Sequence, residues 1–256
     1  MSKTSGMLRE ETVFGPIKSR RLGSSLGINL LPTRGKICNF DCIYCECGWN
    51  ADGRDDTTLP SAAQVRSALE DKLSTLMLEG TPVDSITFSG DGEPTLNPEF
   101  PRIIDDTLRL RDAFYPAAKV SVLSNSTRAH VPEVFEALRK VDNPIMKIDA
   151  PTDALAALIN HPAPGYSVAR VVEALKRFEG DFILQTMMLR TEGFDSGAPE
   201  VLEPWMDIVR TLKPRLVQLY SIDRPTPASN LEKYSIDEMK ALVKPLLAED
   251  FNIQFR

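Results

Sequence analysis

Short apolar runs rich in β-branched residues alternate with amphipathic stretches along most of the chain. The apolar runs predict β-strands, and between them apolar residues recur at the three- and four-residue spacing of a helix. In one such stretch Val65, Leu69, Leu73 and Leu76 form one face, and Ser61 stands where an N-cap is expected. The predicted strands span 26–32, 83–90, 119–125, 144–150, 182–189 and 215–222, and the predicted helices span 61–78, 103–110, 131–138, 168–178, 201–212 and 235–246.

Six strand-then-helix units follow one another in this pattern. Because parallel neighbours need a long crossover, which a helix supplies, the alternation predicts an α/β fold with parallel strands. Six units are too few for a closed eight-stranded barrel but suit a partial (β/α)6 barrel of the TIM type. A doubly wound sheet is the competing arrangement, and the pattern alone does not separate the two. We expect one domain over 1–256, with a core at about 14–227 and a C-terminal helix and short strand within 235–256.

The charge of the chain narrows the range of its partners. With 30 Lys and Arg against 36 Asp and Glu, the net charge of -6 argues against broad electrostatic adhesion to nucleic acid. Lys18, Arg20 and Arg21 form a local basic cluster that either meets an anionic substrate or lies on a solvated surface. No apolar run approaches the roughly 20 residues of a membrane span, and the first residues lack the pattern of a secretion signal. We therefore expect a cytoplasmic protein without a membrane partner.

All four cysteines lie between positions 38 and 47. A disulfide framework spreads its cysteines along the chain, so thiols this close together indicate metal ligands. Cys38, Cys42 and Cys45 have the spacing C-x3-C-x2-C, and three thiolates on a cubane cluster leave its fourth iron open to a small molecule. Structural zinc is the alternative, but zinc usually takes four ligands from two separated pairs. Cys47 is interpreted as a free thiol beside the cluster, and a ligand role for it stays open.

The loop GKICNFDCIYCECGWN (35–50), with Tyr44 before its third cysteine, resembles the signature of the radical S-adenosylmethionine (SAM) superfamily. The runs GPIKSRRLGSSLGIN (15–29) and SGDGEPTL (89–96) resemble a subgroup of Fe–S oxidoreductases that is distantly related to wyosine-forming tRNA enzymes. This resemblance extends from about 14 to about 227. It implies a partial (β/α)6 barrel whose first strand precedes the cysteine loop, and a [4Fe–4S] cluster on that loop.

The resemblance also implies the chemistry. SAM is expected to chelate the open iron through its amino and carboxylate groups. An electron from a donor such as flavodoxin or ferredoxin then cleaves the sulfonium bond and yields a 5′-deoxyadenosyl radical. The cofactor carries this chemistry while the protein orients it.

Two groups of residues match cofactor contacts of the superfamily. Tyr44 is expected beside the adenine of SAM, or packed between the loop and the barrel. The superfamily's Gly-Gly-Glu-Pro motif binds the methionine amino group, but here an aspartate interrupts the glycine pair, so the contacting carbonyl stays open. Without the cysteine loop, the same run would be interpreted as a Gly-rich turn with an exposed acid. The residues concerned are Gly90, Asp91, Gly92 and Glu93.

Polar residues at the ends of later strands complete the predicted site. Ser124 and Asn125 follow the third strand, where the ribose hydroxyls are expected, although Ser-Asn is also a common turn. Lys147 and Asp149 alternate onto one face of the fourth strand, and Gln185 lies on the fifth. We predict that Asp149 and Gln185 face the cofactor and Lys147 the substrate, with a purely structural ion pair as the alternative.

Arginines are predicted at the mouth of the barrel. Arg20 and Arg21 precede the first strand, and Arg224 follows the sixth. They are expected either to bind an anionic substrate through bidentate contacts or to face solvent.

Three substrate classes fit a radical SAM enzyme: a tRNA base, a peptide and a small metabolite. The acidic composition weighs against tRNA, and the absence of a second cysteine cluster weighs against the peptide-modifying enzymes with auxiliary clusters. A small molecule is favoured by elimination. A different class of function, an Fe–S redox sensor or scaffold, would have no use for the SGDGEPTL run.

Overall fold

Six parallel strands stand side by side in the order in which they occur along the chain. The computed structural model describes residues 11–19, 22–53 and 56–256. A doubly wound sheet would reverse its strand order at a switch point, and these six strands do not. The order therefore confirms the barrel-type α/β fold and excludes the doubly wound alternative. The strands are β2 (Gly23–Ile28), β3 (Ser85–Phe88), β4 (Lys119–Ser124), β5 (Asn143–Lys147), β6 (Ile183–Met187) and β9 (Leu216–Tyr220).

A further strand lies at each edge of this sheet. β1 (Val13–Ser19) pairs antiparallel with β2, and β11 (Ile253–Phe255) pairs parallel with β9. The short C-terminal strand was predicted, whereas β1 was not. The first parallel strand also begins earlier than predicted and ends at Ile28. It ends there because the Asn29 side chain accepts a hydrogen bond from the backbone N–H of Leu31 at 3.1 Å, which turns the chain.

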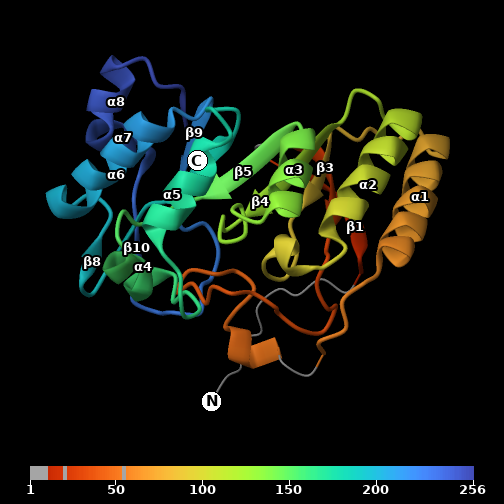
Figure 1. Cartoon of the computed structure of the whole chain (residues 1–256), viewed down its shortest axis with the longest axis horizontal. Helices are drawn as coiled ribbons and strands as arrows, with labels where there is room; N and C mark the ends of the chain where they lie inside the picture. The colour runs from red at the N-terminus through yellow and green to blue at the C-terminus, as the bar shows by residue number, and fades with distance from the viewer. Residues whose placement is uncertain (1–10, 20–21, 54–55) are drawn as a thin grey trace.

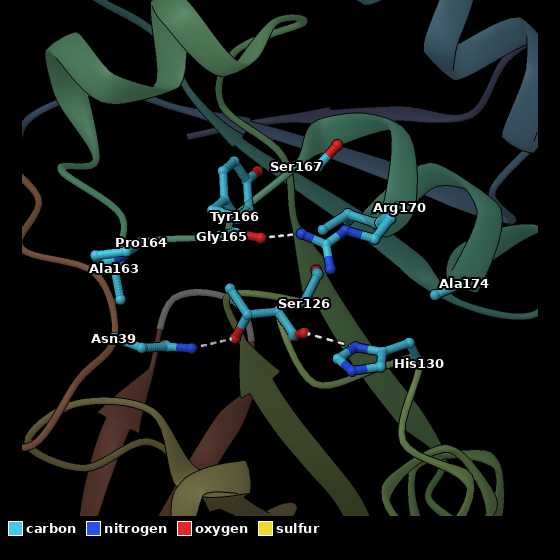
Figure 2. A pocket seen from close by; sticks show the side chains of 12 residues that line it. Asn39, Ser126, His130, Ala163, Pro164, Gly165, Tyr166, Ser167, Arg170 and Ala174 are labelled. Atoms are coloured by element: carbon cyan, nitrogen blue, oxygen red, sulfur yellow. Dashed lines mark hydrogen bonds between the residues drawn. The ribbon is translucent and has the colours of Figure 1, made fainter.

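Helices cover one side of the sheet. In Figure 1 the helices between the parallel strands follow one another across the near side, and consecutive helices pack together, α1 on α2, α2 on α3 and α5 on α6. The predicted C-terminal helix is divided in two, and Pro245, which has no N–H to donate, lies in the first turn of the second part. Helix α4 was not predicted. The helices are η1 (Asn50–Gly53), α1 (Ala62–Leu78), η2 (Pro94–Leu96), α2 (Phe100–Phe114), α3 (Pro132–Lys140), α4 (Asp153–Ile159), α5 (Val168–Lys176), α6 (Pro199–Leu212), α7 (Ile236–Leu242) and α8 (Lys244–Ala248).

A small antiparallel sheet lies beside the barrel. It consists of β10 (Glu232–Lys233), β7 (Leu189–Thr191) and β8 (Phe194–Asp195), with β7 in the middle. The predicted strand at 182–189 therefore combines all of β6 with the first residue of β7. No helix in the described part of the chain is long and apolar enough to cross a membrane.

The two faces of the barrel sheet differ in polarity. On β3, Ile86 and Phe88 are fully buried in the apolar core that also contains the helices. Ser85 and Thr87 alternate onto the opposite face, where Thr87 Oγ1 lies 2.8 Å from Ser25 Oγ on β2 and Ser85 Oγ lies 3.3 Å from Ser121 Oγ on β4. The inside of the barrel is therefore polar and internally hydrogen-bonded, which suits a binding cavity more than a packed core.

Helix α1 allows a matched test of the core. Its capping box is present, since Ser61 Oγ accepts from the Gln64 N–H and the Gln64 side chain accepts from the Ser61 N–H. Leu69 is fully buried, whereas Leu78 on the same helix is 88% exposed. Leu69→Ala should lower the free energy of unfolding by about 2–5 kcal/mol because it leaves a cavity. Leu78→Ala should change it by less than about 0.5 kcal/mol. Denaturant titration measures both, and equal losses would contradict this assignment of the helix face.

Candidate active site at the carboxyl ends of the strands

A cavity of about 550 Å³ opens on the polar inside of the barrel. Ser25 and Thr87 line its base, and Gln185 and Gln218 line it from β6 and β9. Gln185 Nε2 donates to Gln218 Oε1 at 3.3 Å, and Gln218 Nε2 donates to Gln254 Oε1 on β11 at 3.1 Å. This row of amides holds the inner faces of three neighbouring strands together and leaves a polar wall on the cavity.

The cysteine loop crosses one end of the sheet and is fixed there by backbone hydrogen bonds. In Figure 1 it is the orange-red segment that follows β2. On one side Ile37 pairs with the turn after β3: its N–H donates to Asp91 O at 3.1 Å, and its carbonyl accepts from the Glu93 N–H at 3.1 Å. On the other side the N–H groups of Asp41 and Ile43 donate to the last residues of the α4 region, at 2.8 and 3.0 Å. An irregular loop is therefore positioned as firmly as a strand.

Two successive turns arrange the thiols. Cys45 N–H donates to Cys42 O at 3.1 Å, and Gly48 N–H donates to Cys45 O at 3.0 Å. All four cysteines are half-buried and reduced. Side-chain amides point at two of them: Asn125 Nδ2 lies 3.7 Å from Cys38 Sγ, and Asn160 Nδ2 lies 3.4 Å from Cys42 Sγ. Amide donors of this kind stabilise negative charge on sulfur.

A buried cation faces the thiols. Lys36 is 4% exposed, and its Nζ donates to Gly48 O at 2.6 Å and lies 3.4 Å from Asp41 Oδ1. Burial lowers the pKa of Lys36, but the negative charges of Cys45 and Cys38 outweigh burial, so its pKa is raised and the side chain stays protonated. The pKa of Cys45 is lowered to about 6, first by a hydrogen bond from Cys47, against burial, and then by Lys36. A thiolate is the form that binds metal, and Cys45 is the one of the three cysteines that this environment favours in that form. Burial raises the pKa of Cys42 to about 11 and that of Cys38 well above its usual value.

The thiols do not form a site for one metal ion. Among the residues that the structure describes, no three His, Cys, Asp or Glu side chains converge as a single ion requires. A set of thiols spread over two turns, with amide donors and a buried cation behind them, fits an iron–sulfur cluster.

Glu93 ties the turn after β3 to the end of β4. Its buried carboxylate accepts from Thr95 N–H at 3.1 Å, from Thr95 Oγ1 at 2.5 Å and from Ser124 Oγ at 2.9 Å through one oxygen. The other oxygen accepts from the Asn125 N–H at 2.6 Å. Burial raises the pKa of Glu93, although each of these hydrogen bonds lowers it. The carboxylate is engaged within the protein, so its main effect is to position the two strand ends.

Both glycines of the turn are required by close protein neighbours. A Cβ on Gly92, where φ is +134°, would lie 1.9 Å from Ile37 O, and a Cβ on Gly90 would lie 2.0 Å from Asn29 Oδ1. Asn29 also accepts from the Asp91 N–H at 3.1 Å and donates to Asp91 Oδ2 at 3.2 Å. The turn is thus packed directly between the end of β2 and the cysteine loop, and no side chain fits at either glycine.

A second buried network joins the loop to β5 and β9. Tyr44 donates its hydroxyl to Asp149, whose other oxygen lies 3.3 Å from Lys147 Nζ. Lys147 also bonds the hydroxyl of Tyr220 and lies over the rings of Tyr44 and Tyr220, at 5.0 and 4.6 Å from their centroids. Burial lowers the pKa of Lys147, but Asp149 and Tyr220 outweigh it, so the ammonium persists. Asn160 Nδ2 completes the network with contacts to Tyr44 at 2.7 Å and Asp149 at 2.8 Å.

The family model of the radical SAM superfamily matches residues 33–196, which include the cysteine loop, the turn after β3 and every member of the second network except Tyr220. The chain belongs to the radical SAM superfamily. The sequence resemblance to this superfamily is thereby confirmed at the level of the superfamily.

Curated relatives are similar at about 30% identity. A UPF0026 protein of Helicobacter pylori strain J99 is 30% identical over 233 residues, which are 89% of this chain and 71% of that protein. A UPF0026 protein of Methanocaldococcus jannaschii is 30% identical over 69% of this chain and 53% of its own length. A Brachyspira hyodysenteriae protein named GTPase Obg is 29% identical over 95% of this chain, but this chain spans only 34% of it.

Solved radical SAM structures share the fold. A radical SAM methyltransferase from Sphaerobacter thermophilus has a TM-score of 0.67 at 18% identity, over 91% of this chain and 65% of that chain. Streptococcus suis SuiB bound to S-adenosylmethionine has a TM-score of 0.62 at 15% identity, over 90% of this chain and 50% of that chain. Archaeal TYW1 has a TM-score of 0.57 at 12% identity, over 89% and 72%. At these identities the likeness establishes the fold alone.

The structure brings most of the predicted radical SAM site together, but it gives several residues protein partners. Ser124 and Asn125 form hydrogen bonds with Glu93 and the cysteine loop, and their contact with the ribose stays a prediction. Lys147 and Asp149 face one another as an ion pair, and Lys147 also contacts Tyr44 and Tyr220. Tyr44 lines the cavity and packs the loop on the barrel, and its place beside the adenine of SAM stays a prediction.

The predicted arginines divide into two groups. Arg224 lines the cavity, and its guanidinium is 2.7 Å from the Glu46 carboxylate of the cysteine loop. Its contact with an anionic substrate stays a prediction. Arg20 and Arg21 lie outside the described residues. Lys18 lines the cavity and is exposed.

Sequence reasoning missed three residues of the site: Lys36, Asn29 and Asn160. Lys36 precedes the first cysteine by two positions, and a cation this close to the thiols was a usable signal. Asn29 lies at the end of the first strand, and a polar residue at that position was a second usable signal. Asn160 had none, because it is 118 residues from the cysteine that it contacts.

Gly92→Ala tests whether the loop depends on the turn after β3. The new Cβ would displace Ile37, so the purified, anaerobically reconstituted protein should contain less iron per chain and lose more than about 2 kcal/mol of stability. Gly80→Ala is the matched control, since Gly80 also has a positive φ of +68° but no atom within 4 Å of a Cβ. Its strain should cost about 1–2 kcal/mol with full iron content. Equal iron loss in both variants would contradict the role of the turn.

Proposed function

We propose that the chain is a radical SAM enzyme that holds a [4Fe–4S] cluster on Cys38, Cys42 and Cys45 and reductively cleaves SAM. The observation that supports this most is the position of the cysteine loop, which is fixed to the turn after β3 beside a cavity of about 550 Å³. When bound, the cluster supplies the electron that splits SAM into methionine and a 5′-deoxyadenosyl radical. The residues around the cluster bind and orient these groups.

The loop's surroundings support a negatively charged, redox-active group. Lys36 supplies a buried positive charge, and Asn125 and Asn160 supply hydrogen bonds to two sulfurs. Such donors stabilise the more negative, reduced state of a cluster. The half-burial of the cysteines excludes much of the solvent from the site.

The backbone carbonyls of the turn after β3 are candidate acceptors for the methionine ammonium of SAM. Asp91 O already accepts from Ile37, and the Glu93 carboxylate already accepts four hydrogen bonds. Gly90 O is contacted by the Cys47 thiol, at 3.9 Å. We therefore infer that Gly90 O, with the nearby Asp91 carboxylate, receives the ammonium. Gly90 O is thus our proposal for the carbonyl that the interrupted glycine pair left open.

The cavity supports a small-molecule substrate. Pockets of about 300–1,000 Å³ hold small ligands, and this one must also admit the nucleoside end of SAM beside Tyr44. Asp149 and Lys147 hold Tyr44 and Tyr220 in place on its wall, so we assign them positioning roles. A reductant such as flavodoxin or ferredoxin is the proposed electron donor.

Reductive cleavage is the direct test of this function. Anaerobic, cluster-loaded protein given dithionite and SAM should release 5′-deoxyadenosine slowly without substrate, measured by chromatography. Cys42→Ala should reduce product to background because it removes one cluster ligand. Leu78→Ala, exposed on α1, should match the wild type.

A cluster-loaded wild type that makes no more 5′-deoxyadenosine than Cys42→Ala contradicts the proposal. A redox sensor would then fit better if the cluster's reduced spectrum also fails to change when SAM is added.

Asn160→Ala tests the hydrogen bond to Cys42. Removing a donor to sulfur destabilises the reduced cluster, so the midpoint potential should fall by about 40 mV, the one-electron equivalent of about 1 kcal/mol. Anaerobic redox titration followed by electron paramagnetic resonance measures it. Asn230→Ala, on an exposed residue outside the site, should leave the potential unchanged. A potential that stays at the wild-type value in Asn160→Ala would remove this residue from the electrostatics of the cluster.

A further inference from the structure

The fourth cysteine lies on the same side of the loop as the other three. The turn from Cys45 to Gly48 brings Cys47 back beside Cys45, to which it donates a hydrogen bond. The buried Lys36 ammonium, which interacts with the other three thiols, interacts with Cys47 as well. Cys47 is thus a neighbour of Cys45, and its thiol also contacts the turn after β3.

The Cys47 thiol lies where the proposed cofactor contact would be made. Its Sγ is 3.9 Å from Gly90 O and 3.8 Å from Asp91 Oδ1. These are the two acceptors that we assign to the methionine ammonium. A thiol and an ammonium cannot both occupy this position, so Cys47 must move when SAM binds.

Three of the four thiols account for three irons of a cubane, and the fourth iron needs a partner whenever SAM is absent. We propose that Cys47 ligates the fourth iron in the resting protein and that SAM displaces it. This inference rests on the proposed function. The exchange transfers no electrons: the thiol loses a proton when it binds iron, and the departing thiolate takes one up again. Its consequence is a cluster that is closed to solvent and oxidants until the cofactor arrives.

Iron lability in the absence of SAM tests the resting state. Wild type, Cys47→Ala and Cys47→Ser are reconstituted anaerobically, and all three should be brown, because three ligands remain. Each is then mixed with a chelator, and iron release is followed by absorbance. Both variants should release one iron in four at least about tenfold faster than the wild type, since removing a ligand weakens metal affinity by this order or more. Mild oxidation should give a larger [3Fe–4S] signal by electron paramagnetic resonance in both.

Cys47→Ser separates ligation from packing, because serine keeps nearly the same volume but is a poor iron ligand. Release of the fourth iron at the wild-type rate from both variants overturns the proposal. A fast rate in Cys47→Ala alone also overturns it, since that result indicates a packing effect.

SAM affinity gives an independent readout. The wild type must displace a ligand before it binds SAM, so its apparent affinity is reduced by the population of the closed state. Cys47→Ala should bind SAM about tenfold more tightly in an equilibrium titration, and equal or weaker binding contradicts the exchange. If the wild-type cluster does not respond to SAM at all, the proposed function fails, while the iron-release experiment still decides the resting ligand.

Discussion

Two backbone hydrogen bonds between Ile37 and the turn after β3 govern the arrangement of the site. They join an irregular loop to the parallel sheet as a short extension. The barrel therefore holds the thiols of this loop in fixed positions. The contact is so close that the turn has no room for a side chain at Gly92. The cysteine loop and the turn after β3 are therefore one structural unit, so a substitution that displaces one of them displaces the other.

The second organising feature is the polar inside of the barrel. Serine, threonine and glutamine side chains bond one another across neighbouring strands, and this satisfies groups that would be costly to bury alone. At the strand ends, Glu93 and Asp149 are buried carboxylates that join separate strands to the loop. Such networks specify one arrangement because every member must be satisfied together. The cavity wall is consequently set by hydrogen bonds, while the apolar core on the other face supplies the stability.

Several residues that a motif match assigns to the cofactor act on the protein in this structure. Ser124, Asn125 and the Glu93 carboxylate hold the strand ends and the loop in register. The backbone of the turn is what stays near the cofactor position, with Gly90 O in contact with Cys47. These side chains thus have a structural role in the site, whatever contacts they make with a ligand.

The sequence by itself determined the strand and helix pattern, the parallel α/β class and the three-thiol loop, whereas the strand order of the structure decided between a barrel and a doubly wound sheet. It could do so because hydrophobic periodicity and ligand spacing are local properties. It missed β1, α4 and the small sheet, whose elements are short or lie at an edge, where periodicity is weak. The tertiary structure alone decided which partners the site residues take. Asn160 and Cys42 are 118 residues apart in the sequence, and Arg224 and Glu46 are 178 residues apart. No local sequence pattern therefore predicts either contact. Only the closure of the strands around one cavity brings these groups together, because their positions follow from the fold as a whole.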